Sequence, residues 1–354
     1  MLQSLEIEHF RCIDHASLDF DQHATAICGD NGSGKTSLLE AIFFLGHARS
    51  FRTNAREHLL ARGAEFLRIV GRLSGPATET VVGAEFAGGQ TKLRLDGRTP
   101  RSAAELAQVL PLQIIDPSVH RLIEEGSARR RRALDWGVFH VKHEFMASWR
   151  RYQRALEQRN AALRAHRAAA EVTAWDAELA SAGGSLDAAR REYLGILESH
   201  LTVLSGSLCS GDASVDYSPG WPADMPLADA LEKSWERDRR LATTTVGPHR
   251  ADLRFKRDGQ LARDVVSRGE QKMLALAFIL AQVRCLAHQR GTQTCLLLDD
   301  PGAELDVDNL GKLLGVISRF DSQLIVTAVD QVPLRYLEVN RVFHVKQGQF
   351  NRVL

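Results

Sequence analysis

The sequence lacks long apolar runs, has few aromatic residues and carries almost no net charge. Its longest uninterrupted apolar run, Met273 to Ala281, is nine residues long, whereas a membrane-spanning helix needs about 20. The first residues, Met1 to Glu6, show neither the basic start nor the apolar stretch of a signal peptide. We therefore expect a cytoplasmic protein without a membrane segment.

Cysteine pairs of the kind that bind zinc are also missing. The five cysteines are an odd number and contain no C-x-x-C pair, so neither a disulfide framework nor a structural zinc site is encoded. Internal repeats and low-complexity tails are absent too. What remains, 354 residues that are 44% hydrophobic and 25% charged, is typical of a globular protein with a substantial core.

The formal net charge of +1 conceals an uneven distribution. From Arg121 to Arg167 there are 12 basic and 5 acidic residues, a balance of +7, while the rest of the chain has 33 basic and 39 acidic residues. Two interpretations of this basic stretch stay open. It is either an ordinary solvated helix surface or a binding surface for a polyanion such as nucleic acid.

Strand and helix patterns alternate near both ends of the chain. We expect a helix over Lys35 to Leu45 and a β-meander over the three runs between residues 67 and 95, because Gly88-Gly89 and Asp96-Gly97 separate them. A hairpin is expected around Gln347-Gly348. Other expected strands are Ser4 to Phe10, Ala16 to Phe20, Thr25 to Cys28, Leu110 to Ile115, Thr294 to Leu298 and Gln323 to Thr327.

The middle of the chain has helical spacing instead. Between about Ser127 and Ser205 we expect two long antiparallel helices joined near Ala170 to Thr173, with Gly183-Gly184 as a point where the second bends or breaks. The proline-containing segment Asp212 to Asp229 is expected to be a loop. The predicted architecture is an α/β head, residues 1–120 and 245–354, with a helical second lobe, residues 121–244.

One motif carries a specific chemistry. Gly29-Asp30-Asn31-Gly32-Ser33-Gly34-Lys35-Thr36 matches the pattern G-x-x-x-x-G-K-[ST] between an expected strand and an expected helix, with Ser37 next in the helix. Backbone amides and the helix N-terminus would surround a phosphate. Lys35 would reach the β- and γ-phosphates of ATP, and the Thr36 hydroxyl would bind Mg²⁺.

A carboxylate is needed to complete such a magnesium site. The apolar run Cys295 to Leu298 ends in Asp299, which we expect to help hold the ion, and in Asp300, which stands where a base polarising the attacking water would be. Together with the phosphate loop, these residues predict a nucleotide-hydrolysing site.

A third motif resembles the signature motif of the ABC ATPase superfamily. Ser267, Arg268 and Gly269 precede an apolar helix and lie 32 residues before Asp299. In ABC proteins this segment binds the γ-phosphate of a nucleotide held by the other protomer, so the resemblance implies ATP shared between two chains. Gln113 occupies the position of the Q-loop.

The chain as a whole resembles the RecF family of bacterial recombination mediators, which are built like the heads of SMC-type ATPases. The match runs in order over essentially the whole chain. It rests most specifically on Arg49-Ser50-Phe51-Arg52-Thr53 and Gly247-Pro248-His249-Arg250-Ala251-Asp252, with support from Leu5 to Arg11, Leu39 to Ile42, Arg130 to Arg132, Leu134 to Trp136, Gln158 to Asn160 and Glu270.

The resemblance implies an ABC-type P-loop ATPase head that dimerises on ATP and binds duplex DNA or single-strand/duplex junctions at gaps. It also implies work with RecR and RecO to load RecA, in recombinational repair and replication restart. Phosphate contacts would come from basic side chains. The candidates are Arg49, Arg52, Arg129, Arg130, Arg131, Arg132, Arg150 and Arg151.

Several positions depart from the transporter form of the ABC pattern. Arg268 replaces a glycine of the signature, Thr327 replaces a switch histidine, and Asp300 is one methylene shorter than the usual glutamate. We therefore expect slow hydrolysis and leave open which group activates water. The resemblance to the RecF family implies that DNA stimulates this hydrolysis. The alternatives are the ATP-binding subunit of a membrane transporter, which the long helical insertion argues against, and an SMC-like scaffold without turnover, which the two aspartates argue against.

Overall fold

The computed structural model describes residues 1–75, 79–329 and 336–354. The chain divides into two compact units, which we call the head unit (Met1–Val119 and Gly291–Leu354) and the helical unit (His120–Arg290). The first boundary lies near the expected residue 120. The return to the head comes at Gly291 instead of residue 245. Residues 252–257 pair with the strand at residues 213–218, and the helix over residues 268–290 packs on the helices over residues 127–141 and 176–208, so both segments belong to the helical unit.

One sheet of the head unit is antiparallel, with the strand order β2-β1-β4-β5-β6. Its buried positions alternate along the chain, as Leu5 and Ile7 show, so one face joins the core. The predicted meander is confirmed as β4, β5 and β6. The strands are β1 (Leu2–Phe10), β2 (Ile13–Asp19), β4 (Phe66–Ser74), β5 (Glu79–Ala87) and β6 (Gln90–Leu95).

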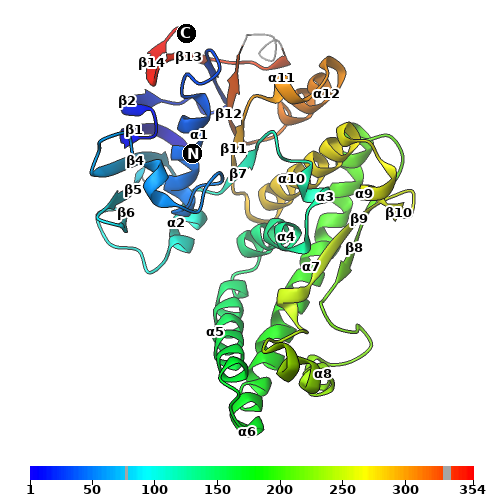
Figure 1. The fold of residues 1–354 in the computed structure, drawn as a ribbon. Coiled ribbons are helices and arrows are strands. Elements are labelled where there is room, and N and C mark those ends of the chain that lie inside the picture. The colour runs from blue at the N-terminus through cyan, green and yellow to red at the C-terminus, as the bar shows by residue number, and fades with distance from the viewer. Residues whose placement is uncertain (76–78, 330–335) are drawn as a thin grey trace. The chain divides into compact units, whose positions relative to one another are not determined.

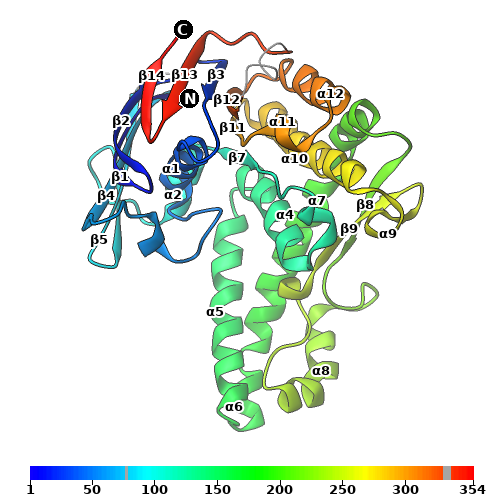
Figure 2. The same ribbon diagram turned by 45° about the horizontal axis from the view of Figure 1, so that its top comes forward.

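The second sheet has the order β14-β13-β3-β12-β11-β7, and its strands are parallel except for β14 (Figure 2). The carboxyl ends of the parallel strands therefore meet at one edge. Gln347 and Gly348 both have positive φ in the predicted hairpin turn. The strands are β3 (Ala24–Cys28), β7 (Leu112–Ile115), β11 (Cys295–Leu298), β12 (Gln323–Ala328), β13 (Arg341–Lys346) and β14 (Gln349–Arg352).

Helix α1 (Lys35–His47) lies in the core between the two sheets, and most of its residues are buried. The apolar side chains of Leu38, Leu39 and Ile42 are fully buried in this core. The other helices among the described residues of the head are short or peripheral. They are η1 (Arg56–Leu59), α2 (Ala103–Val109), α11 (Pro301–Glu304) and α12 (Val307–Ile317).

In the helical unit, α5 (Phe145–Arg164) and α7 (Asp176–Leu208) lie side by side and are joined through α6 (Ala169–Thr173) (Figure 1). These are the two long helices that the sequence predicts. A separate helix, α4, precedes them. The remaining elements are α3 (Arg121–Glu124), α4 (Ser127–Val141), β8 (Ala213–Ser218), α8 (Leu227–Leu241), η2 (Pro248–Arg250), β9 (Asp252–Arg257), β10 (Gln260–Leu261), α9 (Ala262–Val265) and α10 (Arg268–Arg290).

Two local predictions are wrong. Helix α7 is not broken at Gly183-Gly184. Gly183 instead allows close packing, since a Cβ there would lie 2.5 Å from a methyl carbon of Leu227. The segment Asp212 to Asp229 is not a continuous loop. It contains β8, which pairs with β9, and the start of α8.

Candidate functional site

The phosphate loop connects β3 to α1, as a nucleotide site requires. Gly32 and Gly34 adopt φ values of 76° and 119°, the left-handed region that favours glycine. At Gly29 a Cβ would lie 2.3 Å from the backbone oxygen of Val345. Three of the motif's glycines are therefore needed for the backbone path, while Asp30 and Asn31 lie exposed at the loop's tip.

The interior of this loop presents groups that suit an anion. The ammonium group of Lys35 donates to the backbone oxygens of Gly29 at 2.5 Å and Asp30 at 2.9 Å, and the side chain is buried. The Ser33 hydroxyl is also buried and has no hydrogen-bond partner in the described part of the chain. A buried cation, an unpartnered hydroxyl and the start of a long helix fit a nucleotide phosphate.

Thr36 and Asp299 come together at the carboxyl edge of the parallel sheet. The Thr36 hydroxyl lies 2.9 Å and 3.0 Å from the two carboxylate oxygens of Asp299. Burial raises the pKa of Asp299, partly offset by hydrogen bonds from Thr36 and Thr327. A hydroxyl and a carboxylate side by side are oxygen ligands of the kind that Mg²⁺ prefers, so these two residues fit a magnesium ion beside a bound triphosphate.

Thr327 holds the turn that follows β11. Its buried hydroxyl lies 3.0 Å from Asp299 Oδ1 and accepts a 2.9 Å hydrogen bond from the backbone N–H of Asp300. Asp300 has a φ of 46° and begins α11. Where transporters place a histidine, this chain therefore uses a hydroxyl that positions both aspartates.

The assignment of Gln113 is wrong in its geometry. Gln113 lies within the edge strand β7, where it pairs with Leu296, two residues before the carboxyl end of the strand. Asp116 is the residue that follows β7 at the same edge as Asp299, and the negative charge of Asp116 contributes to the raised pKa of Asp299.

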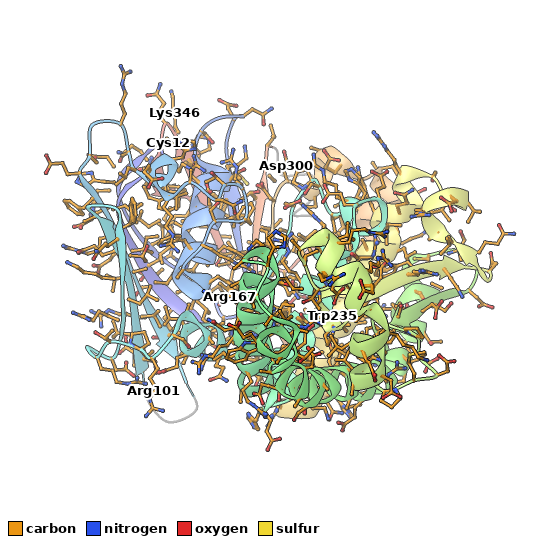
Figure 3. All side chains as sticks on the ribbon, turned by 60° about the horizontal axis from the view of Figure 1, so that its bottom comes forward. Cys12, Arg101, Arg167, Trp235, Asp300 and Lys346 are labelled. Atoms are coloured by element: carbon orange, nitrogen blue, oxygen red, sulfur yellow. The ribbon has the colours of Figure 1, made fainter. Side chains whose placement is uncertain are left out.

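Two turns support the phosphate loop. The sequence predicts one of them, at Gln347-Gly348, as a hairpin, but it indicates a role at the site for neither. The backbone N–H of Gly348, in the β13–β14 turn, donates to the Ser33 carbonyl at 2.7 Å. The thiol of Cys12, in the β1–β2 turn, lies 3.6 Å from the Ser37 hydroxyl. Figure 3 labels Cys12 and, at the end of β13, Lys346. Neither turn carries a nucleotide-binding motif, so the sequence does not show that they contact the phosphate loop.

The signature segment lies in the helical unit at the start of α10. Ser267 and Glu270 form a capping box: the Ser267 backbone N–H donates to the Glu270 carboxylate at 2.9 Å, and its hydroxyl does so at 2.8 Å. These bonds lower the pKa of Glu270. Ser267, Arg268 and Gly269 are all exposed, so the segment is accessible to another molecule.

Two of the candidate DNA contacts are structural instead. Arg130 is buried and makes a two-pronged ion pair with Asp252, at 2.8 Å and 3.1 Å. Arg131 is half-buried and donates to the Ala251 carbonyl at 2.7 Å. The prediction that Arg130 contacts DNA is wrong, because its guanidinium is buried and paired with Asp252 within the helical unit.

The other candidates are at or near the surface, and some have acidic partners. Arg151 pairs with Glu178 at 2.7 Å and Arg129 with Glu125 at 2.9 Å. Surface pairs of this type contribute little to stability, so both arginines stay candidates for phosphate contacts. The candidates with exposed side chains are Arg49, Arg52, Arg132, Arg150 and Arg151.

The two family-specific groups act as anchors within their units. Glu40 of α1 is fully buried and binds Arg11 at 2.8 Å and the Ser50 hydroxyl, which holds the segment Arg49 to Thr53 against the phosphate-loop helix. In the segment Gly247 to Asp252, the Pro248 carbonyl accepts from buried Arg190 at 2.9 Å. Both groups therefore shape the fold around them.

Comparison with known proteins identifies the family of this chain. The model of the RecF/RecN/SMC N terminal domain matches residues 1–351. A curated relative from Thioalkalivibrio sulfidiphilus, named DNA replication and repair protein RecF, is 38% identical over 353 residues, 98% of each chain. A protein of the same name from Stutzerimonas stutzeri is 38% identical over 99% of this chain and 97% of its own.

Solved structures show the same fold. A chain described as the recombination mediator protein RecF-ATP in the RecFOR pathway aligns with a TM-score of 0.90 at 24% identity, covering 100% of this chain and 97% of its own. An Smc head bound to the C-winged helix domain of ScpA aligns with a TM-score of 0.61 at 17% identity, covering 99% and 97%. The predicted fold class, an ABC-type ATPase head with a helical second lobe, is confirmed.

Proposed function

This chain belongs to the RecF/RecN/SMC family, and we propose that it is an ATP-dependent, DNA-binding recombination mediator. In this proposal it dimerises on ATP, binds duplex or gapped DNA, and acts with RecR and RecO to help load RecA. The names of its full-length relatives support this role. The match over residues 1–351 also leaves no support for the alternative of a transporter subunit. Within residues 1–75, 79–329 and 336–354, every helix is too short or too polar to cross a bilayer.

The observation that carries the proposal is the contact of Thr36 with Asp299 beside the phosphate loop. Two motifs 263 positions apart meet at 2.9 Å, on the edge where Lys35 and the α1 N-terminus also lie. This is the arrangement needed for ATP with Mg²⁺. When bound, the ion would neutralise phosphate charge, while Lys35 orients the phosphates and Asp300 polarises the attacking water.

In the proposal, dimerisation uses the exposed signature segment. The backbone amides of Arg268 and Gly269 at the α10 N-terminus would donate to an anion, as would the Ser267 hydroxyl once it releases the Glu270 carboxylate, and the helix dipole favours negative charge there. In our proposal that anion is the γ-phosphate of ATP held by a second copy. ATP is then the link that holds the dimer, and its hydrolysis releases it.

DNA binding in the proposal relies on exposed arginines of both units, such as Arg49, Arg52, Arg132 and Arg150. Salt-sensitive phosphate contacts, without reading of bases, fit a protein that acts at gaps regardless of sequence. The proposed place of action is the cytoplasm, where bacterial DNA lies and RecA-type filaments form.

The test is the oligomeric state of the full chain, measured by light scattering with and without ATP, in the presence of a gapped duplex. We expect a monomer without nucleotide and a DNA-bound dimer with ATP and Mg²⁺. A protein that stays monomeric and off DNA under every condition would contradict the proposal.

A further inference from the structure

A basic groove lies within the helical unit, between the end of α5, the short helix α6 and α8. Its volume is about 980 Å³. Leu163 and Val172 form a buried apolar floor. Trp235, half-buried on α8, and Arg167, beyond the end of α5, both line it, and both are labelled in Figure 3.

The groove concentrates positive charge that the unit itself does not use. In the described part of the chain, no carboxylate oxygen lies within 4.0 Å of the cationic nitrogens of Arg167, Lys233, Arg237 or Arg240. All four side chains are exposed. The carboxylate in the lining, Glu236, already pairs with Arg239.

This pattern contrasts with the basic residues nearby. Arg159, one turn before the end of α5, has a fully buried side chain and pairs with Asp176 and Asp238, each at 2.7 Å. Structural arginines in this unit are therefore buried and paired. The unpaired exposed cations of the groove do not follow that rule.

Helix capping accounts for only part of the cluster. Arg239 and Arg240 lie in the last turn of α8, where cations favour the negative end of the helix dipole. Lys233 and Arg237 precede that turn. Together with Arg240 they follow the spacing i, i+4, i+7, so the three lie along one face of α8. Arg167 faces the same groove from another segment.

The spacing and the aromatic ring indicate the ligand. Lys233 and Arg240 are seven residues apart, about 10 Å along a helix axis, and a DNA strand carries a phosphate about every 3.4 Å of its axis. The face therefore reaches more than one phosphate. Trp235 provides an aromatic surface on which an unpaired base stacks, a contact that an acidic peptide does not exploit.

We propose that this groove binds single-stranded DNA beside a duplex, with phosphates on Lys233, Arg237, Arg240 and Arg167 and a base on Trp235. The inference rests on the proposed DNA-binding function and gives it a surface that favours gaps over continuous duplex. It assigns the preference for junctions to the helical unit, through residues outside the basic stretch that the sequence singled out, apart from Arg167.

The test measures binding of the full chain, with a non-hydrolysable ATP analogue and Mg²⁺, to two fluorescent probes: a duplex with a thymidine gap and a blunt duplex of equal length. We expect Trp235→Ala to bind the gapped probe about tenfold more weakly and the blunt probe like the wild type. Trp235→Phe, which keeps an aromatic ring, should recover most of the loss.

The charge contribution is tested with Arg237→Ala, for which Arg284→Ala is the matched control. Arg284 is another exposed arginine of the helical unit, on α10 outside the groove. Arg237→Ala should lower the slope of log affinity against log salt on the gapped probe by about 0.7, while Arg284→Ala should not. Thermal unfolding of each variant verifies that it is folded.

Three results would overturn the groove assignment: wild-type affinity of both Trp235→Ala and Arg237→Ala for the gapped probe, equal losses in Arg237→Ala and Arg284→Ala, or equal losses on the gapped and blunt probes. The first result would indicate that the groove binds another anion, such as an acidic peptide. A wild-type protein that binds neither probe would instead contradict the proposed function.

Discussion

The hydroxyl of Thr36 lies 2.9 Å from a carboxylate oxygen of Asp299, although 263 positions separate the two residues in the chain. The parallel pairing of β3, β12 and β11 creates this contact, because it brings the ends of β3 and β11 to one edge with a single strand between them. The magnesium-binding part of the proposed site is therefore a property of the sheet.

Removal of the phosphate-loop cation should abolish ATP binding. In Lys35→Met the ammonium group that now bonds the loop carbonyls, and that would face the β- and γ-phosphates, is lost. We expect no measurable ATP binding by calorimetry and no ATP-driven dimer in light scattering. Unchanged ATP affinity would remove the phosphate-loop assignment.

Asp300→Asn should separate binding from turnover. The amide preserves the shape of the side chain but cannot act as a base, so ATP binding should persist while hydrolysis slows by about 100-fold or more and the dimer accumulates. Phosphate release and light scattering measure the two effects. If this variant hydrolyses ATP at the wild-type rate, another group activates the water.

Ser267→Arg should leave each monomer able to bind ATP yet prevent dimerisation, because the arginine would clash where the α10 N-terminus approaches a partner's γ-phosphate. A mixture with Lys35→Met provides the control. Each mixed dimer contains one composite site with both elements intact and one with both lost, so ATP-dependent dimers should partly recover. Normal dimerisation of Ser267→Arg alone would exclude the composite site.

Loss of the Thr327 hydroxyl should shift the pH dependence of magnesium-supported ATP binding. Burial raises the pKa of Asp299, and the hydrogen bond from Thr327 opposes that rise. Thr327→Val should therefore raise the pKa further, so that the acidic limit of binding, where Asp299 becomes protonated, moves to higher pH. Thr327→Ser, which keeps a hydroxyl, should resemble the wild type in the same titration. Identical profiles for Thr327→Val and the wild type would mean that Asp299 does not bind the ion in its charged form.

Arg159 should matter for stability far more than Arg151, although both are arginines of α5 with acidic partners. The side chains of Arg159 and Asp238 are fully buried, so Arg159→Met leaves a buried charge unpaired and should lower the free energy of unfolding by about 3 kcal/mol. Arg151→Met breaks an exposed pair with Glu178 and should leave the free energy of unfolding nearly unchanged. Urea denaturation followed by circular dichroism compares them, and equal midpoints would contradict the buried network.

The sequence by itself was sufficient for those features that depend on a few neighbouring residues. The phosphate loop needs glycine at left-handed positions and a lysine and a threonine at the helix start, so residues 29–36 alone predicted the nucleotide site. Asp299 was predictable because a buried strand ends there. The hairpin at Gln347-Gly348 and the meander from β4 to β6 followed from turn residues for the same reason.

Long-range packing decided the rest. Arg130 and Arg132 are two positions apart and look alike in the sequence, yet Arg130 is buried against Asp252, 122 residues away, while Arg132 is exposed. Composition counts charges but does not reveal their partners, since an ion pair depends on which helix face meets which loop. Gln113 was misplaced for a related reason: the distance of a residue from a sheet edge depends on strand register, which only the paired structure establishes.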